Sequence, residues 1–384
     1  MKSVLFLSHT SELNGAELWL LQFLTGLNRS KFNPLLVVPY PGPLADCAQT
    51  AGVQTVLIPF KWWLTEKVGL WKQPLSWLWN ARSVLRLARL IEERKVDAVV
   101  SNSAASFSGA LAAKAKAIPH IWAVHEILGK KKPQLSFLLG QRILIRLIQS
   151  LSCKVVISSR ATGLCFGESE KVRLVYSGVD LPTGDLPDPK VFRTRFNLSE
   201  DDVVLGMVGR ICNEKGQREM IQALGLLSTD YPRLKLLLAG GVKDKNYLSS
   251  LQKIIERENL GNRVIFAGFQ KDIISLLDAL DCLVVASKME SFGRTIIEAM
   301  AVRTPVIAVR SGGIPEIITS GENGLLLDSR KPEELKKAII SFFHDQAAFQ
   351  RAADEGVETV KKGFLLQNQI HGIESVLEEC LGQS

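Results

Sequence analysis

One short stretch in the second half of the chain carries two cations suited to binding an anion. In "MVGRICNEKG" a strand-like run ends at Gly209, and Arg210 and Lys215 follow before the next helical pattern. Arg offers a planar fork and Lys a mobile point charge, and each charge-assisted bond to a phosphate is worth about 1.5–3 kcal/mol. We expect a diphosphate clamp here. The alternative that the residues leave open is a pair of solvated surface cations.

A second stretch, "MESFGRTIIEAM", places two carboxylates around a predicted helix start. If Gly293 permits a turn, a helix begins near Arg294 or Thr295, and its first backbone N–H groups form an anion site. Glu298 then lies in the first or second turn and Glu290 in the loop before it. A carboxylate accepts two hydrogen bonds at a spacing that suits the vicinal hydroxyls of a ribose or sugar ring. Helix-dipole stabilisation by acidic residues is the competing explanation.

Two further candidates lie in the first half. Asn14 and Gly15 are expected to form a tight turn after the first strand, with Asn14 tolerating positive φ and a helix beginning near Ala16. His125 and Glu126 follow the apolar run "HIWAV", and a lone histidine at a strand end is also compatible with a purely structural role. No G-x-G-x-x-G or G-x-x-x-x-G-K-[ST] motif is present, which disfavours a dinucleotide or nucleoside triphosphate site.

The elements that must position these residues are β-α units. Short apolar runs alternate with longer amphipathic stretches, which is typical of parallel sheets covered on both faces. Strands are predicted at 3–8, 34–39, 54–59, 97–101, 120–124, 154–158, 203–209, 235–240, 263–268, 282–287, 305–309 and 324–328. Three closing helices are predicted from 333 onward, and the Pro- and Gly-rich segment 177–189 is expected to be a linker.

A chain of 384 residues exceeds what one core usually organises, so two domains are expected. The prediction is an α/β protein with two doubly wound, Rossmann-like domains facing a cleft. Residues 1–182 form the first domain and 183–360 the second, and 361–384 form a helix that packs back toward the first.

The motifs together are more specific than each alone. "GRICNEKG", "MESFGRTIIEAM", "SGGIPEI" and "ENGLLL" occur in this order, with "LNGAE" and "VYSGVD" upstream. In this combination the chain resembles the retaining nucleotide-sugar glycosyltransferases of family 4, which have the GT-B fold. The sequence departs from the family's usual pattern at Asn14, at Ser177 and at Arg294, where an aliphatic residue is common.

The resemblance implies a role for each candidate. Glu298 would bind the donor ribose, Glu290 would lie near the donor sugar, and Arg210 and Lys215 would hold the diphosphate. His125 would lie beside the transferred sugar, so His125, Glu290, Arg210 and Lys215 are the expected catalytic residues. The implied donor-binding set is Gly15, Arg210, Lys215, Glu290, Ser291, Phe292, Gly293, Arg294, Thr295 and Glu298. The resemblance favours a UDP-sugar donor and implies transfer with retention by front-face substitution; neither a metal ion nor another cofactor is expected.

The resemblance implies that the first domain holds the acceptor, and the composition of that half suggests what kind of acceptor it is. Residues 1–185 carry 22 Lys and Arg against 12 Asp and Glu, residues 186–384 carry 25 against 27, and all seven tryptophans lie in the first half. Trp-rich apolar helices with Arg, and with Lys130, Lys131 and Lys132 nearby, suit an anionic membrane surface and a lipid-linked or other glycan acceptor. A Trp-packed core and an aromatic platform for a soluble sugar remain alternatives.

The remaining features of the sequence bear on cellular location and on rival functions. Six scattered cysteines without a C-x-x-C pair, and no apolar run long enough for a signal or a bilayer span, predict a cytoplasmic protein, with peripheral attachment to the membrane as a further expectation. A sugar-nucleotide epimerase of the same architecture and a non-catalytic nucleotide-sugar-binding scaffold are the rival functions. Nucleic-acid binding is not expected, because the basic residues form no recognisable module.

Overall fold

The computed structural model describes residues 1–382 except 66–70, 72, 130–134 and 185. It divides into two compact units, one formed by Met1–Gly178 with Leu366–Ser384 and the other by Val179–Leu365. The sequence placed its boundaries at 182/183 and 360/361. Lys130, Lys131 and Lys132, on which part of the membrane hypothesis rests, lie outside the described residues.

The first unit contains a seven-stranded parallel sheet in the order β3-β2-β1-β4-β5-β6-β7. The predicted strands of this half are present, with ends that differ by at most two residues from those expected. β7 was missed because it is only three residues long and largely unburied. The strands are β1 (Lys2–Ser8), β2 (Phe32–Val38), β3 (Gln54–Leu57), β4 (Ala98–Asn102), β5 (His120–Val124), β6 (Lys154–Ile157) and β7 (Val172–Leu174).

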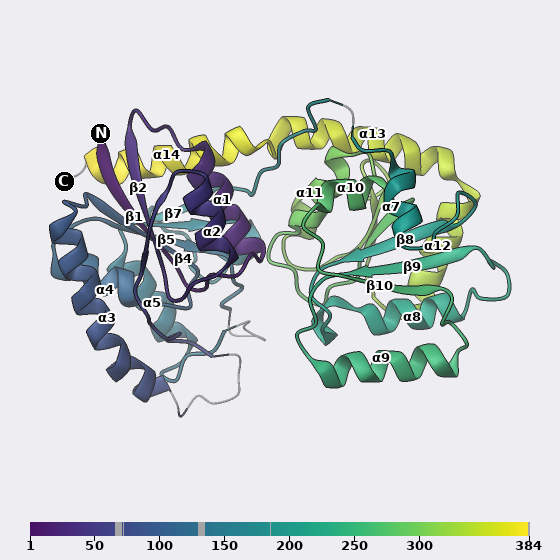
Figure 1. Ribbon diagram of the computed structural model, residues 1–384, viewed down its shortest axis with the longest axis horizontal. Coiled ribbons are helices and arrows are strands. Elements are labelled where there is room, and N and C mark those ends of the chain that lie inside the picture. Colours follow the sequence, from purple (N-terminus) through teal and green to yellow (C-terminus); the bar gives the residue numbers. More distant parts are fainter. Residues whose placement is uncertain (66–70, 72, 130–134, 185, 383–384) are drawn as a thin grey trace. The chain divides into compact units, whose positions relative to one another are not determined.

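Helices cover both faces of this sheet (Figure 1). On one face, side chains of β1 pack with those of α1, α2 and the C-terminal helix α14. On the other face, β1 and β4 pack against α3 and α4, and β5 packs against α5. The helices are α1 (Gly15–Gly26), α2 (Pro43–Thr50), α3 (Gln73–Glu93), α4 (Ser108–Ala115), α5 (Gln141–Leu151), α6 (Arg160–Gly163) and α14 (Leu366–Gly382).

The second unit repeats the plan with six parallel strands in the order β10-β9-β8-β11-β12-β13. Every strand predicted for this half is present. The strands are β8 (Val203–Val208), β9 (Leu234–Ala239), β10 (Val264–Gly268), β11 (Cys282–Val285), β12 (Val306–Val309) and β13 (Leu325–Leu327).

In Figure 1, α8 and α9 lie on one side of the second sheet and α10 and α11 on the other. The core between the sheet and α8, α9 and α12 is built mainly from Leu and Ile side chains, with Val, Ala, Met and Phe among them. The helices are α7 (Pro189–Arg195), α8 (Gln217–Gly225), α9 (Lys245–Arg257), α10 (Ile273–Asp278), α11 (Arg294–Ala301), α12 (Pro332–His344) and α13 (Gln346–Gly363), with short 3-10 turns η2 (Asn213–Lys215) and η3 (Ile314–Glu316). No helix within the described ranges combines the length and the apolar character that crossing a bilayer requires.

The strand order of each sheet determines where ligands are expected. In both sheets the order reverses beside the first strand, between β1 and β4 and between β8 and β11. Doubly wound sheets bind ligands outside the carboxyl ends of the strands at such a switch point. The loops after β1, β8 and β11, with the start of α11, carry most of the candidate residues, and His125 follows β5.

Candidate active site

Lys215 and Glu290 form an ion pair at the carboxyl edge of the second sheet. The Lys215 ammonium donates to Glu290 Oε2 over 2.6 Å, and Ser287 Oγ donates to the same oxygen over 2.9 Å. The side chains of Lys215 and Glu290 are 25% and 19% exposed. Burial alone would raise the pKa of Glu290, but Lys215, Ser287 and the charge of Arg210 together hold that pKa below its ordinary value. Glu290 is therefore ionised at neutral pH.

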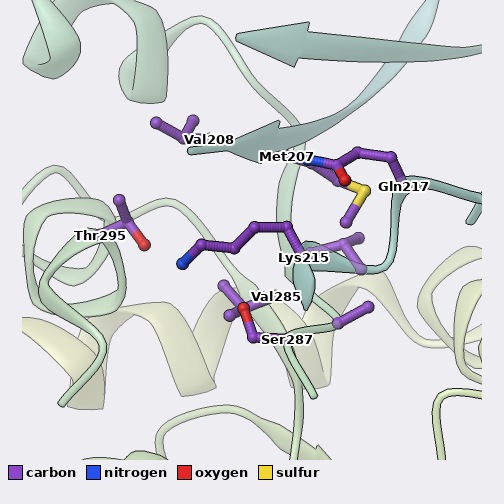
Figure 2. A pocket seen from close by; sticks show the side chains of 9 residues that line it. Met207, Val208, Lys215, Gln217, Val285, Ser287 and Thr295 are labelled. Carbon is purple, nitrogen blue, oxygen red and sulfur yellow. The ribbon is translucent and has the colours of Figure 1, made fainter. Parts of the chain in front are cut away.

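A small pocket lies between the end of β8, β11 and the start of α11. Figure 2 shows the Lys215 side chain extended across it, with the ammonium toward Thr295. Met207 and Val285 line its apolar side. Arg210 is exposed next to it, and its carbonyl oxygen accepts a hydrogen bond of 3.0 Å from Gln217 at the start of α8. Two cations and the first turn of a helix thus meet at one edge of the sheet.

The helix predicted after Gly293 begins at Arg294, as expected from the sequence. Gly293 has φ 110°, a left-handed conformation that glycine adopts without steric cost. The first N–H groups of α11, together with the helix dipole, make this end of the helix favourable for an anion. Thr295 lies in this first turn and lines the pocket.

Arg294, where the sequence departs from the family's usual pattern, is bonded to Glu298 rather than directed to solvent. Its Nε donates to Glu298 Oε1 over 2.7 Å, one turn further along α11. The two side chains are 14% and 11% exposed. A guanidinium therefore already occupies one oxygen of the carboxylate that the family resemblance assigns to the donor ribose.

The loop that carries Glu290 is supported by the turn after β12. The Gly313 N–H donates to the Glu290 carbonyl oxygen over 2.9 Å. Gly312 has φ +54°, and a Cβ added there would lie 1.7 Å from the same carbonyl oxygen. A side chain at Gly312 would therefore collide with the backbone of the Glu290 loop.

In the first unit, the loop after β1 differs in detail from the prediction. Asn14 is the N-cap of α1 with φ −100°, so its tolerance of positive φ is not used, and the helix begins at Gly15, one residue before Ala16. No atom lies within 4 Å of the position that a Cβ on Gly15 would occupy. The loop is thus open at Gly15, where the resemblance places a donor phosphate.

His125 follows β5, and its Nε2 lies 2.8 Å from Asn102 Oδ1 at the end of β4. Its ring packs edge to face with that of Trp19, with 4.7 Å between ring centroids. Glu126 does not bond to this ring: its carboxylate accepts from the Ser103 hydroxyl and from the backbone N–H groups of Ala104 and His125. Burial, and to a lesser extent His9, lower the pKa of His125 far below its ordinary value.

The sequence reasoning missed a buried pair beside this histidine. His9 Nδ1 lies 3.2 Å from Glu17 Oε1, yet neither atom makes a hydrogen bond to any described residue. Burial lowers the pKa of His9 to about 4 and raises that of Glu17 to about 7. The signal in the sequence was a histidine directly after a strand and a glutamate in the first turn of the next helix.

The candidates of the second unit are brought together at one sheet edge, with one qualification. The Phe292 side chain is 4% exposed and its ring packs 5.7 Å from that of Phe364, so only its backbone is available to a ligand. Ser291 is partly exposed. Gly15 and His125 lie in the first unit. Within the described ranges, no three His, Cys, Asp or Glu side chains come close enough to hold a metal ion.

Comparisons with known proteins place both halves in one family. Residues 13–182 match the family described as Glycosyltransferase Family 4, and residues 190–358 match Glycosyl transferases group 1. The N-acetyl-alpha-D-glucosaminyl L-malate synthase of Bacillus anthracis is 25% identical over 56% of this chain and 55% of its own length. The lipopolysaccharide core biosynthesis glycosyltransferase LpsE of Rhizobium meliloti (strain 1021) is 32% identical over 44% of this chain and 48% of its own. The chain thus spans about half the length of these curated relatives.

The structure is also similar to that of Anabaena HepE, solved in complex with UDP-glucose. The two are 25% identical, with a TM-score of 0.84 over 99% of this chain and 100% of HepE. Together with the two family matches, this similarity confirms the GT-B fold expected from the motifs. The chain belongs to the family 4 glycosyltransferases.

Proposed function

We propose that this chain is a glycosyltransferase that moves a sugar from a nucleotide diphosphate donor, favourably a UDP-sugar, to a hydroxyl group of a glycan or lipid-linked acceptor. The arrangement of charges at the carboxyl edge of the second sheet carries this proposal. There, Lys215, Arg210 and the start of α11 are suited to bind a diphosphate. The carboxylate of Glu298 lies one turn further along the same helix.

The proposed chemistry follows from these charges. When the bond to the sugar breaks, negative charge grows on the leaving diphosphate and the sugar becomes similar to an oxocarbenium ion. Arg210, Lys215 and the amides of α11 would stabilise the leaving group through fixed positive charge and dipoles. Glu298 would bind the ribose hydroxyls. The neutral His125 would avoid repelling the positively charged sugar.

We further propose that transfer proceeds with retention and without a metal ion. Glu290 is engaged by Lys215 and Ser287, so it is not poised as a nucleophile. A front-face reaction, in which the acceptor hydroxyl gives its proton to the leaving phosphate, requires no protein nucleophile. Glu290 would instead orient Lys215 and contact sugar hydroxyls.

Two structures of HepE favour UDP as the nucleotide of the donor. HepE was solved with UDP-glucose, and UDP alone is bound in another structure of that protein. We would titrate UDP, GDP and ADP by calorimetry into the purified chain with EDTA present. The expected result is that UDP binds, and that Glu298→Ala and Arg210→Ala each weaken it by about tenfold or more.

Matched variants control for unspecific charge effects. Lys253 and Glu256 are exposed on α9, so Lys253→Ala and Glu256→Ala should bind UDP as the wild-type chain does. If no nucleotide binds, the proposal loses its main support and a role outside sugar transfer takes its place. If binding requires a divalent ion, the metal-independent part of the proposal is wrong.

The surface of α3 supports an acceptor at an anionic membrane. Leu75, Leu78 and Trp79 on this helix are 65%, 75% and 53% exposed. Arg82, Arg86 and Arg89 on the same helix are also exposed. Apolar side chains that enter the interface, flanked by cations that meet anionic headgroups, are the combination such a surface favours.

Sedimentation with liposomes tests this part of the proposal. At low salt the chain should pellet with vesicles that contain anionic lipid and stay in solution with vesicles of neutral lipid. Replacing Arg82, Arg86 and Arg89 together by Glu should abolish pelleting, whereas Lys253→Glu with Arg257→Glu on α9 should not. If the wild-type chain stays in solution with anionic vesicles, the membrane hypothesis is wrong and a soluble acceptor is favoured.

A further inference from the structure

A buried asparagine determines how His125 can interact with a substrate. Asn102 ends β4 and is 1% exposed. Its Nδ2 donates to the carbonyl oxygen of Ala16 over 3.0 Å, in the first turn of α1. A backbone carbonyl can only accept a hydrogen bond, so the amide nitrogen must face Ala16. Oδ1 therefore faces the other way, where it lies 2.8 Å from His125 Nε2.

This geometry selects one form of the His125 ring. Oδ1 of an amide can only accept, so Nε2 of His125 must carry the proton. In a neutral imidazole the other nitrogen, Nδ1, then holds a lone pair. No other described residue forms a hydrogen bond with the ring, and His125 is partly exposed.

Among the described residues, no carboxylate forms a hydrogen bond or ion pair with the ring. The titratable groups that face it are His9 after β1, Glu17 on α1 and its own neighbour Glu126. Glu126 is bonded to Ser103 and to backbone N–H groups, and burial raises its pKa. Burial likewise raises the pKa of Glu17 and lowers that of His9.

We propose that Asn102 is a positioning residue that holds His125 as the neutral Nε2–H tautomer, so that the ring presents its Nδ1 lone pair to a hydroxyl group of the sugar substrate. This inference rests on the proposed sugar transfer for its purpose, although not for its geometry. A neutral hydrogen-bond acceptor is favourable beside a sugar that develops positive charge, whereas an imidazolium would repel it.

Nitrogen NMR of the full chain labelled with ¹⁵N-histidine tests the tautomer directly. The His125 signals are assigned from their absence in His125→Gln. In the wild-type chain we expect a protonated Nε2 and an unprotonated Nδ1, with no titration between pH 6 and 8. A protonated Nδ1, or a His125 ring that titrates in that range, would overturn the inference. This measurement requires no variant at Asn102 itself.

Asn102→Asp provides a second readout, because a carboxylate at this position would pair with the ring and favour the imidazolium. We expect His125 to become protonated at neutral pH in this variant. Asn80 is a matched control: it is also buried in this unit, but its amide bonds the backbone of Lys61. Asn80→Asp should leave the His125 signals unchanged, and an equal change in both variants would contradict a specific role of Asn102.

Activity measurements separate this inference from the proposed function. Once a donor and an acceptor are found, Asn102→Asp should lower kcat by about tenfold or more at neutral pH and recover as the pH rises through the new His125 pKa. Nucleotide affinity should change by less than about twofold. A chain with the expected tautomer that binds no nucleotide would refute the proposed function alone. A chain that binds UDP with the opposite tautomer would refute this inference alone.

Discussion

Arg294 offers the sharpest test of the donor site, because its position is unfavourable for the helix itself. It is the first residue of α11, where the helix dipole disfavours a cation by about 0.3–1 kcal/mol. Its ion pair with Glu298, four residues later, places the cation before the carboxylate, which is the weaker order of such pairs. We therefore expect Arg294 to contribute to ligand binding rather than to helix stability.

The perturbation is Arg294→Met, which keeps most of the apolar stem and removes the charge. If the guanidinium turns from Glu298 to the diphosphate when the donor binds, the variant loses a charge-assisted bond worth about 1.5–3 kcal/mol. UDP affinity should then fall by about 10- to 150-fold. Uridine lacks the diphosphate, so its affinity should change by less than about threefold, because Glu298 remains available for the ribose.

Calorimetric titrations of UDP and uridine into the wild-type chain, Arg294→Met and Arg294→Lys give the comparison. Arg294→Lys keeps the charge and should recover part of the UDP affinity, while uridine is again little affected. Equal losses for UDP and uridine would refute the reasoning, because they would mean that Arg294 only orients Glu298. Unchanged UDP affinity would remove Arg294 from the donor site.

Three further predictions concern Lys215, Glu17 and Gly312. Lys215→Met should lower the affinity for UDP by about 10- to 150-fold, measured by calorimetry, and raise the pKa of Glu290, measured by carboxyl NMR. Lys253→Met is the matched control. An unaltered UDP affinity in Lys215→Met would contradict the proposed diphosphate clamp. Glu17 has its pKa raised from 4.5 to about 7, so between these values the folded chain binds more protons than the unfolded chain and stability falls as the pH rises. Glu17→Gln cannot ionise at this position, so it avoids this loss. In urea titrations, the unfolding free energy of the variant minus that of the wild-type chain should increase by about 3 kcal/mol from pH 4 to pH 8. A difference that does not vary with pH would refute the raised pKa. Gly312→Ala would place a Cβ 1.7 Å from the Glu290 carbonyl oxygen and should destabilise the chain by about 1–3 kcal/mol more than Gly321→Ala, which has positive φ but open space; equal thermal shifts would show that the loop moves without cost.

Most of the fold was accessible from local patterns. Apolar runs of four to seven residues predict buried parallel strands, and the alternation with amphipathic stretches predicts their crossover helices. β7 was not predicted, because its three residues form no apolar run. The N-cap role of Asn14 was not recognised for a related reason: an N-cap and a tight turn use the same residue types, and only the backbone of the folded chain distinguishes them.

The candidate residues were visible in the sequence because their chemistry is local. Arg210, Lys215, Gly293 and Glu298 belong to strand-to-helix loops or helix starts, where the residue type and its offset from a glycine already indicate an anion site. The order of the motifs then pointed to the family. None of this required knowing which strands are neighbours.

The partners of those residues were decided only by the tertiary structure. Lys215 and Glu290 meet because β8 lies beside β11, and His125 meets Asn102 because β5 lies beside β4. Burial in the folded chain also shifts the pKa values of His9 and Glu17, and the fold packs Gly312 against the Glu290 loop. A hydrogen bond requires two groups to lie about 3 Å apart, and desolvation requires a group to be covered by other parts of the chain. The periodicity of the sequence predicts neither, because both depend on how the elements pack.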